Sequence, residues 1–299
     1  MGRMQNVKNL FLATHPGPSL AVTAVTLVLA VTAELSADRV VIVTLAMLAN
    51  QFSIGLSNDW LDAARDTRAS RRDKPVAAGA LRSTLVRNVA FACVLISLGL
   101  SAWLGVWVLL AQIIGIASGW AYNLGLKATT LSFVPYAVGF GILPVIVTLA
   151  SSPPALAAPW VIAVAAILGV AAHFANAMPD IEGDRAEGIL GLPQRLGARA
   201  SGIITYVVLL VGAAIAFVGP GLGASIGHSS EPSSLQWMGI GVNVVIALVG
   251  VVLVARLSPE RQTTPTVGRQ PTRLMFQLIM LAALTNVVMI AAAGTSVLA

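Results

Sequence analysis

The chain has 299 residues, of which 57% are hydrophobic and only 10% are charged, and its formal net charge is +6. Soluble globular domains carry about 25% charged residues, so this chain cannot cover a water-exposed surface of ordinary polarity. The composition excludes disorder and a coiled coil, and the single cysteine excludes a secreted disulfide scaffold. Its apolar runs are about twice the ten residues typical of an outer-membrane β-strand. They favour an all-α integral membrane protein.

Nine apolar segments are predicted to cross the membrane, judged against the roughly 20 residues that a transmembrane helix needs. No part of the sequence has the composition of a separate soluble domain, so we expect a single membrane domain over residues 1–299. The predicted spans are Ser19–Ala33, Val40–Leu56, Ser83–Leu100, Trp103–Ala121, Leu131–Ala150, Ala157–Met178, Ala200–Val218, Leu235–Ala255 and Arg273–Ala292.

The distribution of basic residues predicts how these spans are oriented. With nine spans and the N-terminus inside, Arg39 alone of the 18 Lys and Arg residues falls in an outer segment. The positive-inside rule therefore predicts a multi-pass protein of the cytoplasmic membrane, with its N-terminus and both acidic loops in the cytoplasm. Because the loops between spans account for the basic residues, no nucleic-acid partner is expected.

One carboxylate pattern occurs twice. Residues four apart lie on one face of a helix, so each copy is predicted to project one amide and two carboxylates in the same direction. The copies are four predicted spans apart, so both should reach the same side of the membrane. They are Asn58, Asp62 and Asp66 after the second span, and Asn176, Asp180 and Asp184 after the sixth.

This pattern favours a divalent cation. Carboxylates stacked at i, i+4 repel one another, and acids at a bilayer boundary are costly to desolvate; Mg²⁺ relieves both penalties. A few hard oxygen ligands with open positions suit Mg²⁺ shared with a phosphorylated substrate. We therefore predict that Asp62, Asp66, Asp180 and Asp184 are catalytic and that they bind Mg²⁺ together with Asn58, Asp59 and Asn176.

Basic residues near the clusters are candidate phosphate contacts. Lys127 is the single basic residue of its loop, which opens at Tyr122. The plainer interpretation is that the acids cap helices or pair with arginines and that the basic residues only set topology, but two copies on one side favour the metal site. The other candidates are Arg65, Arg71, Arg72 and Lys74 after the first cluster and Arg185 after the second.

At these residues the sequence resembles the UbiA-type intramembrane prenyltransferases. Their first signature, Asn-Asp-x-x-Asp-x-x-x-Asp, stands here at Asn58–Asp66, and the Arg-Pro-x-x-x-Gly element that follows stands at Lys74–Gly79 with Lys in place of Arg. Their second signature, Asp-x-x-x-Asp with a later Gly and Leu-Pro, stands at 180–193. The Tyr-x-x-Lys element stands at Tyr122 and Lys127 with one extra residue, and the Arg-Pro often found before the first span is His15-Pro16.

The resemblance implies nine helices in one bundle around a central cavity, and Mg²⁺-dependent transfer of a prenyl group from a polyprenyl diphosphate. The acidic clusters would hold Mg²⁺ on the diphosphate, while Lys127 and arginines stabilise the leaving group. The prenyl tail would lie among the helices, open to the lipid bilayer. An aromatic or otherwise nucleophilic small-molecule acceptor would then attack the allylic carbon and lose a proton.

Three other functions stay open at this point. Some members of the superfamily cyclise the prenyl chain, and others use a phosphorylated sugar or glycerol phosphate as acceptor. An ion-coupled transporter is the alternative from another class, because intramembrane acids often mark cation pathways. Transporters place such sites near the bilayer midplane, whereas the acids of this sequence gather at one predicted face.

Overall fold

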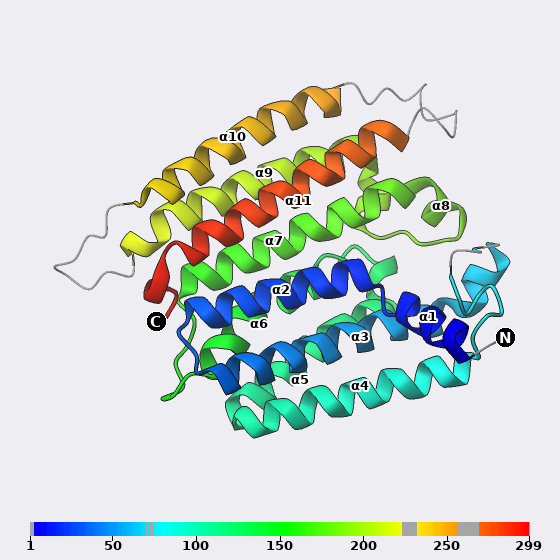
Figure 1. Cartoon of the computed structure of the whole chain (residues 1–299). Coiled ribbons are helices and arrows are strands. Elements are labelled where there is room, and N and C mark those ends of the chain that lie inside the picture. Colours follow the sequence, from blue (N-terminus) through cyan, green and yellow to red (C-terminus); the bar gives the residue numbers. More distant parts are fainter. Residues whose placement is uncertain (1–2, 70, 72–73, 223–231, 256–268, 299) are drawn as a thin grey trace. The chain divides into compact units, whose positions relative to one another are not determined.

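The computed structural model describes residues 3–69, 71, 74–222, 232–255 and 269–298, and this part of the chain is helical throughout (Figure 1). Besides helices and turns, these described ranges contain one isolated β-bridge, between Ala157 and Leu298. Three 3₁₀ turns, η1 (Leu126–Ala128), η2 (Met178–Asp180) and η4 (Gly294–Val297), separate or end helices. The α-helices are α1 (Arg3–Ala13), α2 (Pro16–Thr32), α3 (Ala37–Arg68), α4 (Ser83–Leu104), α5 (Val106–Asn123), α6 (Val134–Leu149), α7 (Pro159–Ala177), α8 (Ile181–Ala186), α9 (Leu192–Leu222), α10 (Ser234–Ala255) and α11 (Arg269–Ala291).

The helices confirm a multi-pass helical membrane protein. Within the described ranges, α3, α4, α5, α7 with α8, α9 and α10 are each long and apolar enough to cross a bilayer. A seventh span results if α1 and α2, which are bent by 65° at their junction, count as one crossing. The remaining two predicted spans correspond to shorter apolar helices, α6 and residues 277–291 of α11. The count of nine crossings therefore stays a prediction.

The chain divides into two compact units. Unit 1 comprises residues 1–125 and 145–155, and unit 2 comprises residues 126–144 and 156–299, so α6 contributes to both. In unit 1, α3 packs against α2, α4 and α5 (Figure 1). Buried polar groups join three of these helices, since Gln112 donates to Ser97 and Ser97 donates to the carbonyl of Ala46. Lipid tails are as apolar as the side chains, so the hydrophobic effect does not drive membrane helices together. Hydrogen bonds of this kind contribute to helix association instead.

In unit 2, α9 packs against α7, α10 and α11. Glycines permit two of the close approaches: Gly250 lies against the ring of Tyr206, and Gly169 against the carbonyl of Tyr136, where in both cases a Cβ atom would overlap its neighbour. Small residues at helix contacts are typical of membrane helices. The predicted single domain over residues 1–299 is not tested by this division and stays a prediction.

Candidate functional site

The first acidic motif lies on the last turns of α3, which continues as one uninterrupted helix to Arg68. Asp62 and Asp66 are buried, with 7% and 2% of their surface exposed. The amide nitrogen of Asn58 donates to Asp62 Oδ2 (3.0 Å) and to Asn123 Oδ1 (3.2 Å) at the end of α5. Three groups four residues apart thus share one helix face, as the spacing predicts.

Arg65 lies between the two carboxylates of this face. Its Nη2 atom is 2.9 Å from Asp62 Oδ2 and 3.5 Å from Asp66 Oδ1. The guanidinium reduces the repulsion between the two acids, and its side chain is still 24% exposed. Arg65 is therefore placed to exchange carboxylate contacts for phosphate oxygens, to which a guanidinium binds well.

Asp59 is 1% exposed and contacts a different pair of residues, Lys74 and His15. Lys74 Nζ lies 2.6 Å from Asp59 Oδ1 and 3.1 Å from Asn58 Oδ1, so the loop after α3 folds back onto the motif. His15 Nε2 lies 2.9 Å from the same Asp59 oxygen. His15 has a left-handed backbone conformation (φ 53°) directly before α2, where α1 and α2 are bent. Gly55 lets the chain pass this close, because a Cβ at Gly55 would overlap the carbonyl of Thr14.

The first motif fits Mg²⁺ in its donor chemistry. Asp66 Oδ2 and Asp59 Oδ2 are buried and have no hydrogen-bond partner. All side chains of the motif offer oxygen, the ligand atom that Mg²⁺ prefers. Among the described residues, no three His, Cys, Asp or Glu side chains already form a metal cage.

The second motif differs from the first in its backbone. We expected one helix face, but α7 ends at Ala177, η2 covers Met178–Asp180, and α8 begins at Ile181. Pro179 explains the break, since proline has no N–H and clashes with the preceding turn of an α-helix. Asn176 and Asp180 are exposed, and the Asn176 amide donates to the Tyr136 hydroxyl (3.4 Å). The spacing is shared with the first motif, but the continuous helix is not.

Asp184 is held by a residue that the motif analysis missed. Gln194, which is 4% exposed at the start of α9, donates from Nε2 to Asp184 Oδ2 (2.7 Å). Arg185 Nε donates to the Gln194 carbonyl (2.6 Å), and its guanidinium lies 3.7 Å from Glu182. The turn before α9 thereby fixes α8 and the last acid of the motif.

Lys127 lies on η1 and packs near the same turn. A Cβ at Gly191 would overlap the carbonyl of Lys127, so this glycine is required for the close approach of the two loops. Ser132, fully buried, accepts from the Leu192 amide (2.9 Å), and its hydroxyl is 3.0 Å from His173 Nε2. The loop that carries Lys127 therefore contacts the turn before α9, whose Gln194 holds Asp184.

The other predicted residues divide between the units. Tyr122 is half-buried in the last turn of α5, in unit 1, whereas Lys127 is in unit 2. Arg71 is half-buried, and its amide donates to the Asp66 carbonyl (2.9 Å). Arg72 lies outside the described residues. The sequence motifs do not include Asn123, Gln194, Ser132 or the contact of His15; of these, Asn123 had a signal, since it adjoins Tyr122.

The fold and both acidic motifs define an intramembrane, polytopic enzyme scaffold, and comparison with known proteins gives its family. The model of the UbiA prenyltransferase family matches residues 19–262. The chain belongs to the UbiA prenyltransferase family. The family expected from the signatures is thereby confirmed.

Individual relatives are more distant. The chain is 27% identical over 191 residues to the bacteriochlorophyll synthase 33 kDa chain of Rhodobacter capsulatus, covering 58% of this chain and 60% of that protein. It is 25% identical over 182 residues to the same protein of Cereibacter sphaeroides, covering 54% and 57%. The match thus spans less than two thirds of the curated relatives' length.

Solved structures share the fold. A digeranylgeranylglyceryl phosphate synthase structure matches with a TM-score of 0.68 at 12% identity, over 97% of this chain and 99% of that chain. A UbiA homologue from Archaeoglobus fulgidus, bound to DMAPP and Mg²⁺, matches with a TM-score of 0.65 at 15% identity, over 94% and 99%. At these identities the likeness shows the fold alone.

Proposed function

We propose that the protein transfers a prenyl group from a polyprenyl diphosphate to a small-molecule acceptor, aromatic or otherwise nucleophilic, in a Mg²⁺-dependent reaction within the membrane. The observation that carries the proposal is the buried acidic face of α3, where Asp62 and Asp66 lie beside Arg65 and the Asp66 Oδ2 atom has no partner. A buried acceptor atom without a partner is costly, and a cation with its phosphate ligand removes that cost.

The candidate residues have two proposed roles: the acidic and Asn side chains bind the metal, and the basic side chains bind the diphosphate. Mg²⁺, when bound by Asn58, Asp59, Asp62 and Asp66 and by Asn176, Asp180 and Asp184, would polarise the diphosphate and assist its departure. Arg65 exchanges its carboxylate contacts for phosphate oxygens. Tyr122 lies at the end of α5, beside the Asn123 that orients Asn58. The remaining anion-binding candidates are Arg71, Arg72, Lys74, Lys127 and Arg185.

Both motifs are proposed to act on one diphosphate. The support for this step is the shared Asn-x-x-x-Asp-x-x-x-Asp spacing and membership of the family. Each unit supplies one motif and its own supporting contacts: Lys74 and Asn123 in unit 1, and Gln194 and Tyr136 in unit 2.

Product analysis tests the proposed reaction. The purified full chain is incubated with Mg²⁺, labelled prenyl diphosphates of several lengths, and a panel of acceptors that includes aromatic compounds, glycerol phosphate and a bacteriochlorophyll precursor. A prenylated acceptor formed only with Mg²⁺ supports the proposal and identifies the acceptor. A cyclic hydrocarbon formed without any acceptor assigns cyclisation instead. Absence of Mg²⁺-dependent diphosphate release over the whole panel contradicts the proposal.

We expect Lys127→Ala to raise the KM for the prenyl diphosphate by about 10- to 100-fold and the KM for the acceptor far less. The reason is that a hydrogen bond to a charged group contributes about 1.5–3 kcal/mol, and Lys127 lies in the same unit as the second acidic motif. Steady-state kinetics with each substrate varied in turn measures this. Arg199→Ala, which removes an exposed cation of the same unit, serves as the control. Unchanged kinetics in Lys127→Ala would show that Lys127 does not bind the diphosphate and contributes only to membrane orientation.

We also propose nine crossings with the N-terminus and both acidic motifs in the cytoplasm. In a Cys93→Ser background, Thr67→Cys at the exposed end of α3 and Ser152→Cys in the exposed turn after α6 should react with an impermeant thiol reagent from opposite sides of the membrane. The reagent is added to intact cells and to inverted vesicles. Labelling of Thr67→Cys in intact cells shows that the orientation is wrong.

A further inference from the structure

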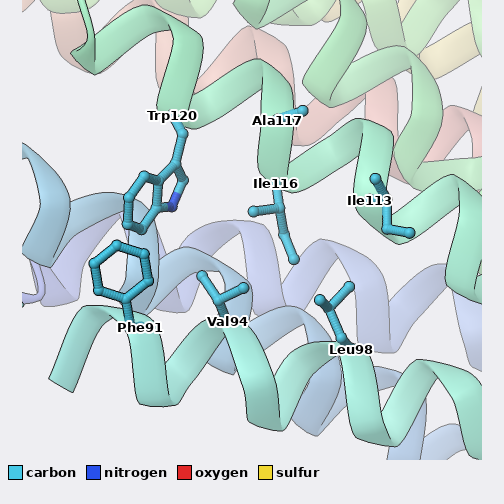
Figure 2. A pocket seen from close by; sticks show the side chains of 7 residues that line it. All are labelled: Phe91, Val94, Leu98, Ile113, Ile116, Ala117 and Trp120. Carbon is cyan, nitrogen blue, oxygen red and sulfur yellow. The ribbon is translucent and has the colours of Figure 1, made fainter. Parts of the chain in front are cut away.

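An open apolar groove runs between α4 and α5 in unit 1 (Figure 2). Its volume is about 280 Å³, close to the lower end of the range for small-ligand pockets. The side chains of α4 and α5 face each other across it, and the ring of Phe91 lies under the indole of Trp120, 5.1 Å between centroids. The lining residues are Phe91, Val94, Leu98, Ile113, Ile116, Ala117 and Trp120.

The groove lies on a helix that the protein itself covers little. Only 22% of the apolar stretch of α4 is buried, against 33–56% for the other five described helices that are long enough to span a membrane. Phe91, Ile113 and Ala117 are exposed. In a bilayer such a surface is in contact with lipid, so hydrocarbon chains are the material that fills the groove.

A basic residue continues the line of the groove toward the polar end of α4. Arg87, Phe91, Val94 and Leu98 follow one another at spacings of four, three and four, so they share one helix face. Arg87 is exposed, and its guanidinium contacts the neutral side chain of Asn88 (3.1 Å). Among the described residues no ion pair of Arg87 with an acid occurs. Its positive charge is therefore open to an anion.

The groove does not belong to the acidic site. Next to its aromatic end lies Trp60 of α3, whose ring centroid is 6.0 Å from that of Phe91 and 6.4 Å from that of Trp120. Trp60 is two residues from both Asn58 and Asp62, which is about 200° around the helix. The groove thus packs on the face of α3 opposite to Asn58 and Asp62, and we take its ligand to be distinct from the diphosphate donor.

We propose that the α4–α5 groove binds an anionic phospholipid, with one acyl chain along the apolar lining and the phosphate on Arg87. The groove runs along α4 from Leu98 to Phe91, and Arg87 lies one helical turn beyond Phe91. An acyl chain in the groove would therefore place its headgroup near the Arg87 guanidinium. Basic residues near membrane surfaces attract anionic headgroups at about 1 kcal/mol each, and guanidinium binds phosphate with well-directed hydrogen bonds. Bound lipid holds the Trp60–Phe91–Trp120 cluster, and through it α3, in place.

Native mass spectrometry of the purified full chain with phosphatidylglycerol or phosphatidylcholine tests the charge recognition. We expect wild type to retain phosphatidylglycerol in preference to phosphatidylcholine, and Arg87→Gln to bind phosphatidylglycerol about fivefold more weakly. Arg82→Gln is the matched control, because Arg82 is exposed at the same end of α4 but is nine residues from Phe91 and so lies on the opposite face. Equal losses in both variants, or none in Arg87→Gln, overturn the proposal.

A second pair of variants tests the acyl-chain site. Ala117→Phe fills the groove and should reduce phosphatidylglycerol binding, whereas Ala92→Phe adds the same ring at an exposed position of α4 outside the lining. Elution as a single species in size-exclusion chromatography shows that each variant is folded. Undiminished binding in a folded Ala117→Phe protein overturns the groove as the site. Neither result depends on prenyl transfer, so failure of this proposal is distinguishable from failure of the proposed function.

Discussion

Asp62→Asn and Asp180→Asn are each expected to abolish turnover, and the double variant is expected to be little worse than either single one. The two motifs are proposed to act on one diphosphate, so the polarisation needed for its departure is a joint property of both. Groups that act as a unit show strongly non-additive effects on rate. Two acids with independent structural roles would instead give additive effects on stability.

The measurement is Mg²⁺-dependent turnover beside the melting temperature for both single variants and the double variant. Asparagine keeps the volume of Asp62 and an oxygen atom for Arg65, so the fold should be retained. Glu182→Gln is a matched control for Asp180, since Glu182 lies two residues away with a 71% exposed side chain and is outside the motif spacing. An active Asp180→Asn enzyme with a lowered melting temperature would contradict the joint action of the two motifs.

The periodic features of the sequence were sufficient to predict the helical membrane class and the face of the first motif. The i, i+4 spacing of Asn58, Asp62 and Asp66 places them together whenever the helix continues, and α3 does continue to Arg68. The same spacing did not give one continuous helix in the second motif, because Pro179 lies in the 3₁₀ turn η2 that separates α7 from α8. That break was visible in the sequence, since proline in the middle of a helix removes a hydrogen bond.

Contacts between distant segments could not be predicted from spacing. The pairs His15–Asp59 and Gln194–Asp184 depend on where the bend before α2 and the turn before α9 bring the chain. Gly55 and Gly191 allow these approaches, but a glycine in a sequence does not tell which backbone it will meet. The contacts of His15 and Gln194 with the two motifs therefore required the three-dimensional structure.

The contact between Lys74 and Asp59 leads to the other large expected effect. Asp59 is 1% exposed, and Lys74 Nζ lies 2.6 Å from its Oδ1 atom. Removing one partner of a buried ion pair costs about 3–5 kcal/mol; here His15 Nε2 stays 2.9 Å from the same Asp59 oxygen, so we expect a loss toward the lower end of this range. Lys74→Met should therefore lower the melting temperature markedly. Lys74→Arg, which restores the residue usual in the family at this position, should retain the stability of the wild type.

Combining Lys74→Met with Asp59→Asn separates a structural ion pair from a substrate contact. If the pair is structural, the double variant removes both charges and should recover much of the stability lost in Lys74→Met, which gives a large coupling free energy in the double-mutant cycle. Thermal unfolding of the four proteins in one detergent measures this coupling. A stable Lys74→Met protein with a raised KM for the prenyl diphosphate would instead assign Lys74 to the substrate. Mg²⁺-dependent turnover of the double variant then decides the role of Asp59. If the Asp59 carboxylate binds the metal, the double variant should be inactive. If Asp59 serves only to hold Lys74, it is dispensable once Lys74 is replaced, and the double variant should be active.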